Sequence, residues 1–74
     1  MALSDEDLVN ALRDHAETLE QTTSPENDSF NRDIRQAEEA RSLASKVEKG
    51  TASAEEKASV PDMVHPSVKT RHDL

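Results

Sequence analysis

Apolar positions near the beginning of the chain recur at intervals of three and four residues, which places them on one face of an α-helix. These positions are Leu8, Leu12 and Leu19, and His15 occupies the position of the same seam between Leu12 and Leu19. Ser4 stands just before them and is followed by three acidic residues. A serine N-cap with carboxylates in the first turn is a typical helix start, because both satisfy or complement the free N–H groups there. We therefore predict a helix over residues 5–20.

The middle of the chain carries a second helical pattern with two apolar lines. The first line contains Phe30, Ile34, Ala37 and Ala44, with Arg41 between the two alanines. The second line is rotated by about 100° around the helix and contains Ala40, Leu43 and Val47. Because the apolar arc is broad, this helix is expected to contact two neighbours.

The two ends of this second helix differ in how sharply the sequence defines them. Ser24 and Pro25 favour a start at the proline, which suits the first helical position. Asn27, Asp28 and Ser29 are poor helix formers and favour a later start, near Ser29. The only glycine, Gly50, follows Lys49. Glycine readily adopts the left-handed conformation that ends many helices, so we predict the last helical residue at Lys49.

A third helix is predicted to be short. Ser53 and Glu56 form the pattern of a capping box, which marks a helix start. Val60 precedes Pro61, and a residue before proline is disfavoured in helical conformation, so the helix should end by Ser59. After it, two prolines fix the backbone and remove two hydrogen-bond donors. Residues 60–74 are therefore expected to form an extended arm.

These elements define an all-α fold: a helical hairpin over residues 1–50, a short helix over 51–59 and an extended proline-containing arm over 60–74. Paired hairpins could form a four-helix bundle. Leu, Ile, Val and Phe make up only about 18% of the chain, and the net charge is −7. Both values favour partial disorder when the chain is alone.

The arm contains a large share of the chain's bulky apolar residues, which must be either docked or exposed. Docking on another protein is one possibility, because extended segments bind partners through their backbone and through alternate side chains. The candidate partner-binding residues are then Leu43, Val47, Val60, Met63, Val64, Val68 and Leu74. Folding back over the second apolar line of the middle helix is the other docked arrangement, and plain disorder is the third.

Composition excludes some classes of partner and location. The chain has 16 acidic and 9 basic residues, a balance that opposes direct contact with nucleic-acid phosphates. No apolar run approaches the roughly 20 residues needed to span a bilayer. The first residues are acidic, whereas a signal peptide begins with basic ones. We therefore expect no membrane partner and a location in the cytoplasm or within an intracellular assembly.

Residues suited to catalysis or to cofactors are sparse. The chain has no cysteine, tyrosine or tryptophan, and one glycine cannot build a phosphate-binding loop. His65 and His72, with Asp62 and Asp73, match no metal-ligand spacing. We therefore predict neither an enzyme nor a cofactor or metal site.

Two polar residues interrupt the predicted helix seams. His15 could act as a pH switch or as a ligand; the simpler interpretation is a boundary histidine with one ring nitrogen reaching water. Arg41 could anchor a partner's carboxylate. The simpler interpretation is that its stem covers alanines while its head reaches solvent, Glu17 or Glu20.

The function that these features favour is protein–protein contact. The chain is predicted to be an accessory or structural component of a larger assembly, such as a virus particle or a multi-subunit complex, or to associate with itself through helix faces. The alternative is a small acidic regulator or inhibitor of one target protein, which could mimic the charge of a nucleic acid. The acidic composition is also compatible with adaptation to high salt.

Overall fold

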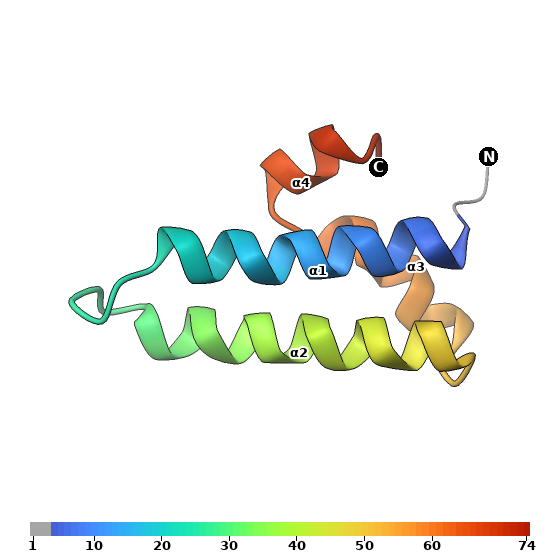
Figure 1. The fold of residues 1–74 in the computed structure, drawn as a ribbon, viewed down its shortest axis with the longest axis horizontal. Helices are drawn as coiled ribbons and strands as arrows, with labels where there is room; N and C mark the ends of the chain where they lie inside the picture. Colours follow the sequence, from blue (N-terminus) through green and yellow to red (C-terminus); the bar gives the residue numbers. More distant parts are fainter. Residues whose placement is uncertain (1–3) are drawn as a thin grey trace.

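The computed structural model describes residues 4–74 and contains four α-helices and no strand within that range. They are α1 (Asp5–Thr22), α2 (Phe30–Lys49), α3 (Ala54–Met63) and α4 (Pro66–Arg71). The two long helices α1 and α2 lie side by side as a hairpin, and α4 lies on the side of α1 away from α2 (Figure 1). Helix α1 contacts each of the other three helices and is the central element.

Helix α1 begins where the sequence predicts. The Ser4 side chain accepts a hydrogen bond from the Asp7 N–H at 3.2 Å, which satisfies one of the free donors of the first turn. Asp5 and Glu6 also lie in that turn. The helix extends two residues beyond the predicted end, to Thr22, whose hydroxyl donates to the Thr18 carbonyl at 2.8 Å.

Helix α2 begins at Phe30, so the earlier of the two predicted starts, at Pro25, is wrong. Residues 24–29 form consecutive turns instead: the Asn27 N–H donates to the Ser24 carbonyl at 2.9 Å, and the Phe30 N–H donates to the Asn27 carbonyl at 3.1 Å. Asparagine and aspartate have low helix propensity and are common in turns, which agrees with the turns that residues 24–29 form here.

The other two predicted helix boundaries are confirmed. Gly50 has φ 76° and ψ 20°, and this left-handed conformation ends α2 after Lys49. At the start of α3, the Glu56 N–H donates to Ser53 Oγ, and the Ser53 N–H donates to Glu56 Oε1, both at 3.1 Å. This is the reciprocal pair of a capping box.

The C-terminal segment differs from the prediction. It is helical rather than extended: α3 continues past Ser59 and through Pro61 to Met63, and α4 follows after a two-residue corner. At that corner His65 is the N-cap of α4, with its Nδ1 accepting from the Ser67 N–H at 3.1 Å. Pro66 takes the first helical position, where its missing N–H has no consequence.

Packing explains why α3 continues through a proline. Pro61 removes one backbone donor, which disfavours a helix interior by about 3 kcal/mol. Beyond it, the Val64 N–H still donates to the Val60 carbonyl at 3.2 Å. Val60 is fully buried and Val64 is 6% exposed. Burial of such side chains contributes about 1.5–3 kcal/mol each, enough to offset the proline.

The core runs along α1 and joins the hairpin to both C-terminal helices. It contains Leu8, Val9, Ala11, Leu12, Ala16, Leu19, Ala37, Ala40, Leu43, Ala44, Val47, Val60, Val64 and Val68. The buried alanines of α1 and α2 have small side chains, which let the two helix backbones approach closely. Most of the predicted seam is therefore buried, but Phe30 and Ile34 are only half-buried, because they lie at the end of the hairpin that the C-terminal helices do not cover.

Candidate functional site: a groove beside a histidine-tied corner

Most residues proposed for partner binding lie in the chain's own core. Val47, Val60, Val64 and Val68 are buried there. The C-terminal segment folds back mainly onto α1, whereas the sequence suggested the second apolar line of α2 for this arrangement. Among the seven candidates, Met63 and Leu74 keep part of their side chains exposed, and Leu43 lies at the edge of the core. The surface left for contact is therefore on the helices and not on a free arm.

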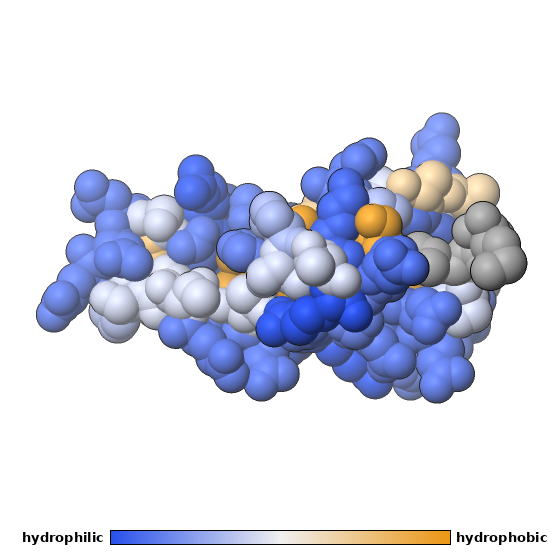
Figure 2. Space-filling model, turned by 90° about the horizontal axis from the view of Figure 1, so that it is seen from above, coloured by the Kyte–Doolittle hydropathy of each residue, from blue (hydrophilic) through white to orange (hydrophobic). Residues whose placement is uncertain are grey.

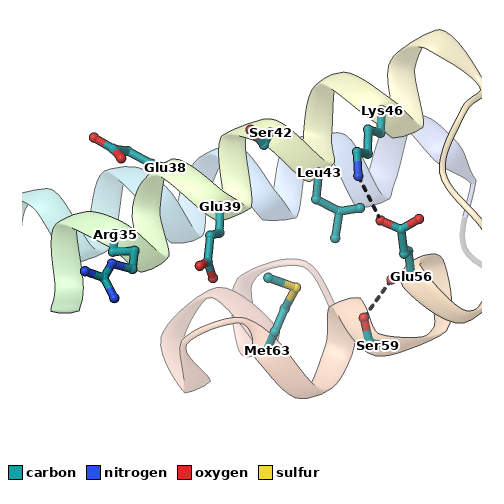
Figure 3. Close-up of a pocket in the computed structure, with 9 residues that line it drawn as sticks. All are labelled: Arg35, Glu38, Glu39, Ser42, Leu43, Lys46, Glu56, Ser59 and Met63. Carbon is teal, nitrogen blue, oxygen red and sulfur yellow. Dashed lines mark hydrogen bonds and ion pairs between the residues drawn. The ribbon is translucent and has the colours of Figure 1, made fainter.

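A groove of about 530 Å³ separates α2 from α3. Leu43 from α2 and Met63 from α3 point toward each other across it (Figure 3). Its volume falls within the roughly 300–1,000 Å³ range of ligand sites. The sequence singled out Leu43 and Met63, but helix periodicity alone offers no means of placing them together.

Charged residues surround this apolar floor. Lys46 Nζ lies 3.5 Å from Glu56 Oε2, which bridges α2 and α3 at one end of the groove. The hydrogen bond from the Ser53 N–H, followed by the nearby Lys46 charge, lowers the pKa of Glu56. Arg35 and Glu39 lie at the other end. The groove can therefore offer apolar contact and a carboxylate to one bound segment.

The corner between α3 and α4 is tied to α1 by a buried histidine. His15 is 5% exposed, and its Nδ1 accepts a hydrogen bond from the His65 backbone N–H at 2.9 Å. Burial, followed by the charge of His65, lowers the pKa of His15. The sequence gives no sign of this bond, because no local pattern brings His15 and His65 together.

Polar contacts also attach the end of α4 to α1. Arg71 Nη2 donates to Asp14 Oδ1 and to Thr18 Oγ1, both at 3.0 Å. His72 Nε2 lies 3.0 Å from the other carboxylate oxygen of Asp14. Together with the His15 bond, these contacts line one side of α1 with partners from the last ten residues. The local basic charge at the end of the chain therefore meets an acid within the same molecule.

Arg41 bridges the hairpin to Glu20. Its Nη1 donates to Glu20 Oε2 at 2.6 Å, and its Nη2 donates to Oε1 of the same carboxylate. The hydrogen bonds from Arg41 lower the pKa of Glu20. The sequence named Glu20 as one of the residues that Arg41 could reach, and the structure places the two in a two-pronged ion pair.

Replacing Arg41 with alanine is expected to raise the pKa of Glu20 toward its ordinary value, because the hydrogen bonds that favour the carboxylate are lost. NMR titration of the side-chain carboxyl carbons measures this directly. Arg13→Ala is the matched control, since Arg13 pairs with Glu48 at 2.6 Å and not with Glu20. An unchanged Glu20 titration in Arg41→Ala would contradict the ion pair.

The face of the molecule that carries α4 is mostly hydrophilic, and hydrophobic residues are visible on it only in small separate places (Figure 2). This agrees with the inward orientation of Val68, which is fully buried. The face offers no broad apolar area for a partner, in contrast to the groove on the other side of the C-terminal helices.

Two further features of the described residues concern metal ligands and membrane-spanning helices. Within residues 4–74, no three histidine or acidic side chains gather closely enough to hold a metal ion. None of the helices described there has the length and apolar character required to cross a membrane.

Comparisons with family models, with curated proteins and with solved structures find no match to this chain. Its function is therefore inferred from its own residues and their geometry.

Proposed function

We propose that the chain acts without catalysis, by binding another protein through the groove between α2 and α3. The observation that carries the proposal is the apolar pair Leu43 and Met63 at the floor of a groove with charged edges. An apolar anchor in a pocket with a polar rim is the usual anatomy of a protein contact.

The charge of the chain favours a basic partner segment. The net charge is −7, and Glu39 lies at the groove beside the apolar floor. A segment that places a leucine-like side chain over Met63 and a lysine or arginine near Glu39 would complement both features. Long-range attraction between such charges increases the rate of association.

We favour the role of a regulator or adaptor that binds a single target protein, since the C-terminal segment is docked on the chain itself.

The role of an accessory component in a larger assembly is the second candidate, and one observation favours it. Phe30 and Ile34, the only phenylalanine and isoleucine, lie one turn apart and half-buried at the open end of the hairpin. A permanent assembly could cover them. Light scattering and Phe30→Ser would distinguish a self-associating chain from a monomeric regulator.

The groove is tested with a synthetic amphipathic helical peptide of leucine and lysine, added to the ¹⁵N-labelled chain. We expect NMR shifts to concentrate around Leu43, Lys46, Ser59 and Met63. A leucine–glutamate peptide of equal length is the control and should not bind. Shifts spread evenly over the acidic residues of α1 would contradict the groove.

One variant pair separates groove contact from general charge attraction. Glu39→Gln is expected to weaken binding of the leucine–lysine peptide about two- to fivefold, as removal of a rim charge usually does. Glu48→Gln is the matched control, because Glu48 lies on the same helix, outside the groove, and pairs with Arg13. Equal weakening by both variants would indicate non-specific attraction and would count against the groove.

A further inference from the structure

His15 is a buried polar side chain with a hydrogen bond that requires its neutral form. Its Nδ1 accepts from the His65 N–H at 2.9 Å, so Nδ1 carries no proton and the ring proton resides on Nε2. His65 stands between α3 and α4 as the N-cap of α4. The bond therefore holds the corner between the two C-terminal helices against α1.

Protonation of His15 would turn this acceptor into a donor that faces another donor. The hydrogen bond would be lost, and a charge would be placed in a site that is only 5% exposed. Opening the corner relieves both problems, because the ring can then reach water. The neutral ring thus favours the closed corner, and the charged ring favours the open one.

Charged groups from each neighbouring element influence whether the His15 ring is neutral or charged. On α1, Asp14 is adjacent in sequence but is engaged by Arg71 and His72. From α2, Glu39 lines a small cavity together with His15 and Gln36. From the end of α3 comes the apolar Met63, and from the corner after it comes the His65 ring, whose charge acts on His15. The carboxylates favour a charged His15, whereas burial and the charge of His65 oppose it.

The pKa of His15 lies below the ordinary value of 6.5. This lowered pKa decides at which pH the corner changes from closed to open. The unfolded or opened chain then binds more protons than the closed one as pH falls through this region. The closed corner is therefore fully stabilised above pH 6.5 and becomes less stable as the pH falls toward the lowered pKa.

Met63 connects this corner to the groove. It lines the cavity beside His15 and also the groove opposite Leu43. It is also the last residue of α3, two positions before His65. When the corner moves away from α1, Met63 moves with it, and the groove loses one side of its apolar floor.

We propose that the hydrogen bond between His15 and His65 is a pH-sensitive latch that holds the α3–α4 corner closed and so keeps the groove competent to bind a basic, apolar segment. Protonation of His15 opens the latch. The part of this inference that concerns binding rests on the proposed function, whereas the latch itself can be tested on the isolated chain.

The latch is tested by NMR on the full chain over about two pH units around the ordinary histidine value. Three signals are followed: the His15 ring, the Met63 methyl group and the hydrogen-exchange protection of the His65 amide, corrected for intrinsic rates. In the native chain, the Met63 methyl should shift with the same midpoint as His15. The opening constant at His65 should rise by up to about tenfold for each unit of falling pH, the limit for one coupled proton.

Two variants at position 15 should abolish this pH dependence in opposite ways. In His15→Asn, the amide oxygen takes the place of Nδ1 as an acceptor that cannot be protonated, so the His65 amide should stay protected at every pH. In His15→Leu the acceptor is missing, and that amide should exchange rapidly at every pH. His72→Gln is the control and should keep the native slope. A flat native profile, or the native slope in either His15 variant, would overturn the latch.

Binding of the leucine–lysine peptide at the same pH values tests the link to the groove. The apparent Kd should rise as the closed fraction falls, because only the closed form is competent, and His15→Asn should remove this dependence. A pH-independent Kd beside a working latch would overturn the regulatory link but leave the groove intact. Absence of binding at any pH would contradict both the proposed binding function of the groove and its regulation by His15. The hydrogen-exchange data would still show whether the His15–His65 bond acts as a latch.

Discussion

Replacing Val60 with aspartate is expected to lower the free energy of unfolding by about 3 kcal/mol or more, because a carboxylate would take the place of a fully buried side chain. The substitution also loses the transfer free energy of the valine, about 1.5–3 kcal/mol. Val60 lies where α3 joins the core, so we expect both C-terminal helices to detach. Urea-induced unfolding followed by far-UV circular dichroism measures the change.

The neighbouring residue provides a matched control. Ser59 lies on the same helix and is exposed, so Ser59→Asp should change stability by no more than about 0.5 kcal/mol. Small domains often have only about 3–5 kcal/mol in total. If Val60→Asp leaves no folded baseline, Val60→Ala gives a measurable loss of roughly 1–3 kcal/mol. Equal effects at positions 59 and 60 would mean that the C-terminal segment is not docked on the chain.

The hairpin could be predicted from the sequence because its signals are local. Ser4 and Gly50 define helix ends through bonds to residues within one turn. The seam residues follow helical periodicity, which depends only on spacing along the chain. For the same reason, the pairing of Arg41 with Glu20 could be named as one of the possible contacts.

Two of the prolines show where local rules fail. Ser24 and Pro25 have the pattern of a helix start, yet turns follow: the Asn27 N–H donates to the Ser24 carbonyl, and the Phe30 N–H donates to the Asn27 carbonyl. His65 and Pro66 have a similar pattern, and there a helix does begin. A capping residue before a proline therefore permits a helix start, but the residues after the proline decide whether one forms.

The spacing of the C-terminal valines indicates a helix, whereas the two prolines near them indicate an extended segment. Val60, Val64 and Val68 recur every four residues, which fits one helix face. Two prolines within residues 60–74 disfavour a helix when only the neighbouring residues are considered. Their burial against α1 is a tertiary effect, and tertiary packing commonly decides whether a short helix forms.

The groove and the histidine-tied corner depend on how separate helices meet. Leu43 and Met63 are twenty residues apart, and His15 and His65 are fifty apart. No periodicity links them, because the orientation of α3 against α1 and α2 decides which side chains converge. His15 stands out in the sequence as a polar residue on an apolar seam, but only the packing of the helices gives its Nδ1 a partner.

The central position of α1 leads to the second large effect. Leu12 is fully buried in the middle of α1, and Leu12→Ala is expected to lower the free energy of unfolding by about 2–5 kcal/mol through lost transfer energy and a cavity. Leu74→Ala makes the same chemical change at a half-buried position and should have an effect below about 1 kcal/mol.

The distribution of the loss caused by Leu12→Ala tests whether the molecule has one core or two. Because α1 contacts α2, α3 and α4, a cavity at Leu12 should weaken the hairpin and the C-terminal helices together. Native-state hydrogen exchange should then show similar losses of protection for buried amides of α2 and for those around Val64. A loss confined to the hairpin would mean that α3 and α4 fold as a separate unit. The position of Met63 over the groove would then be independent of the hairpin core.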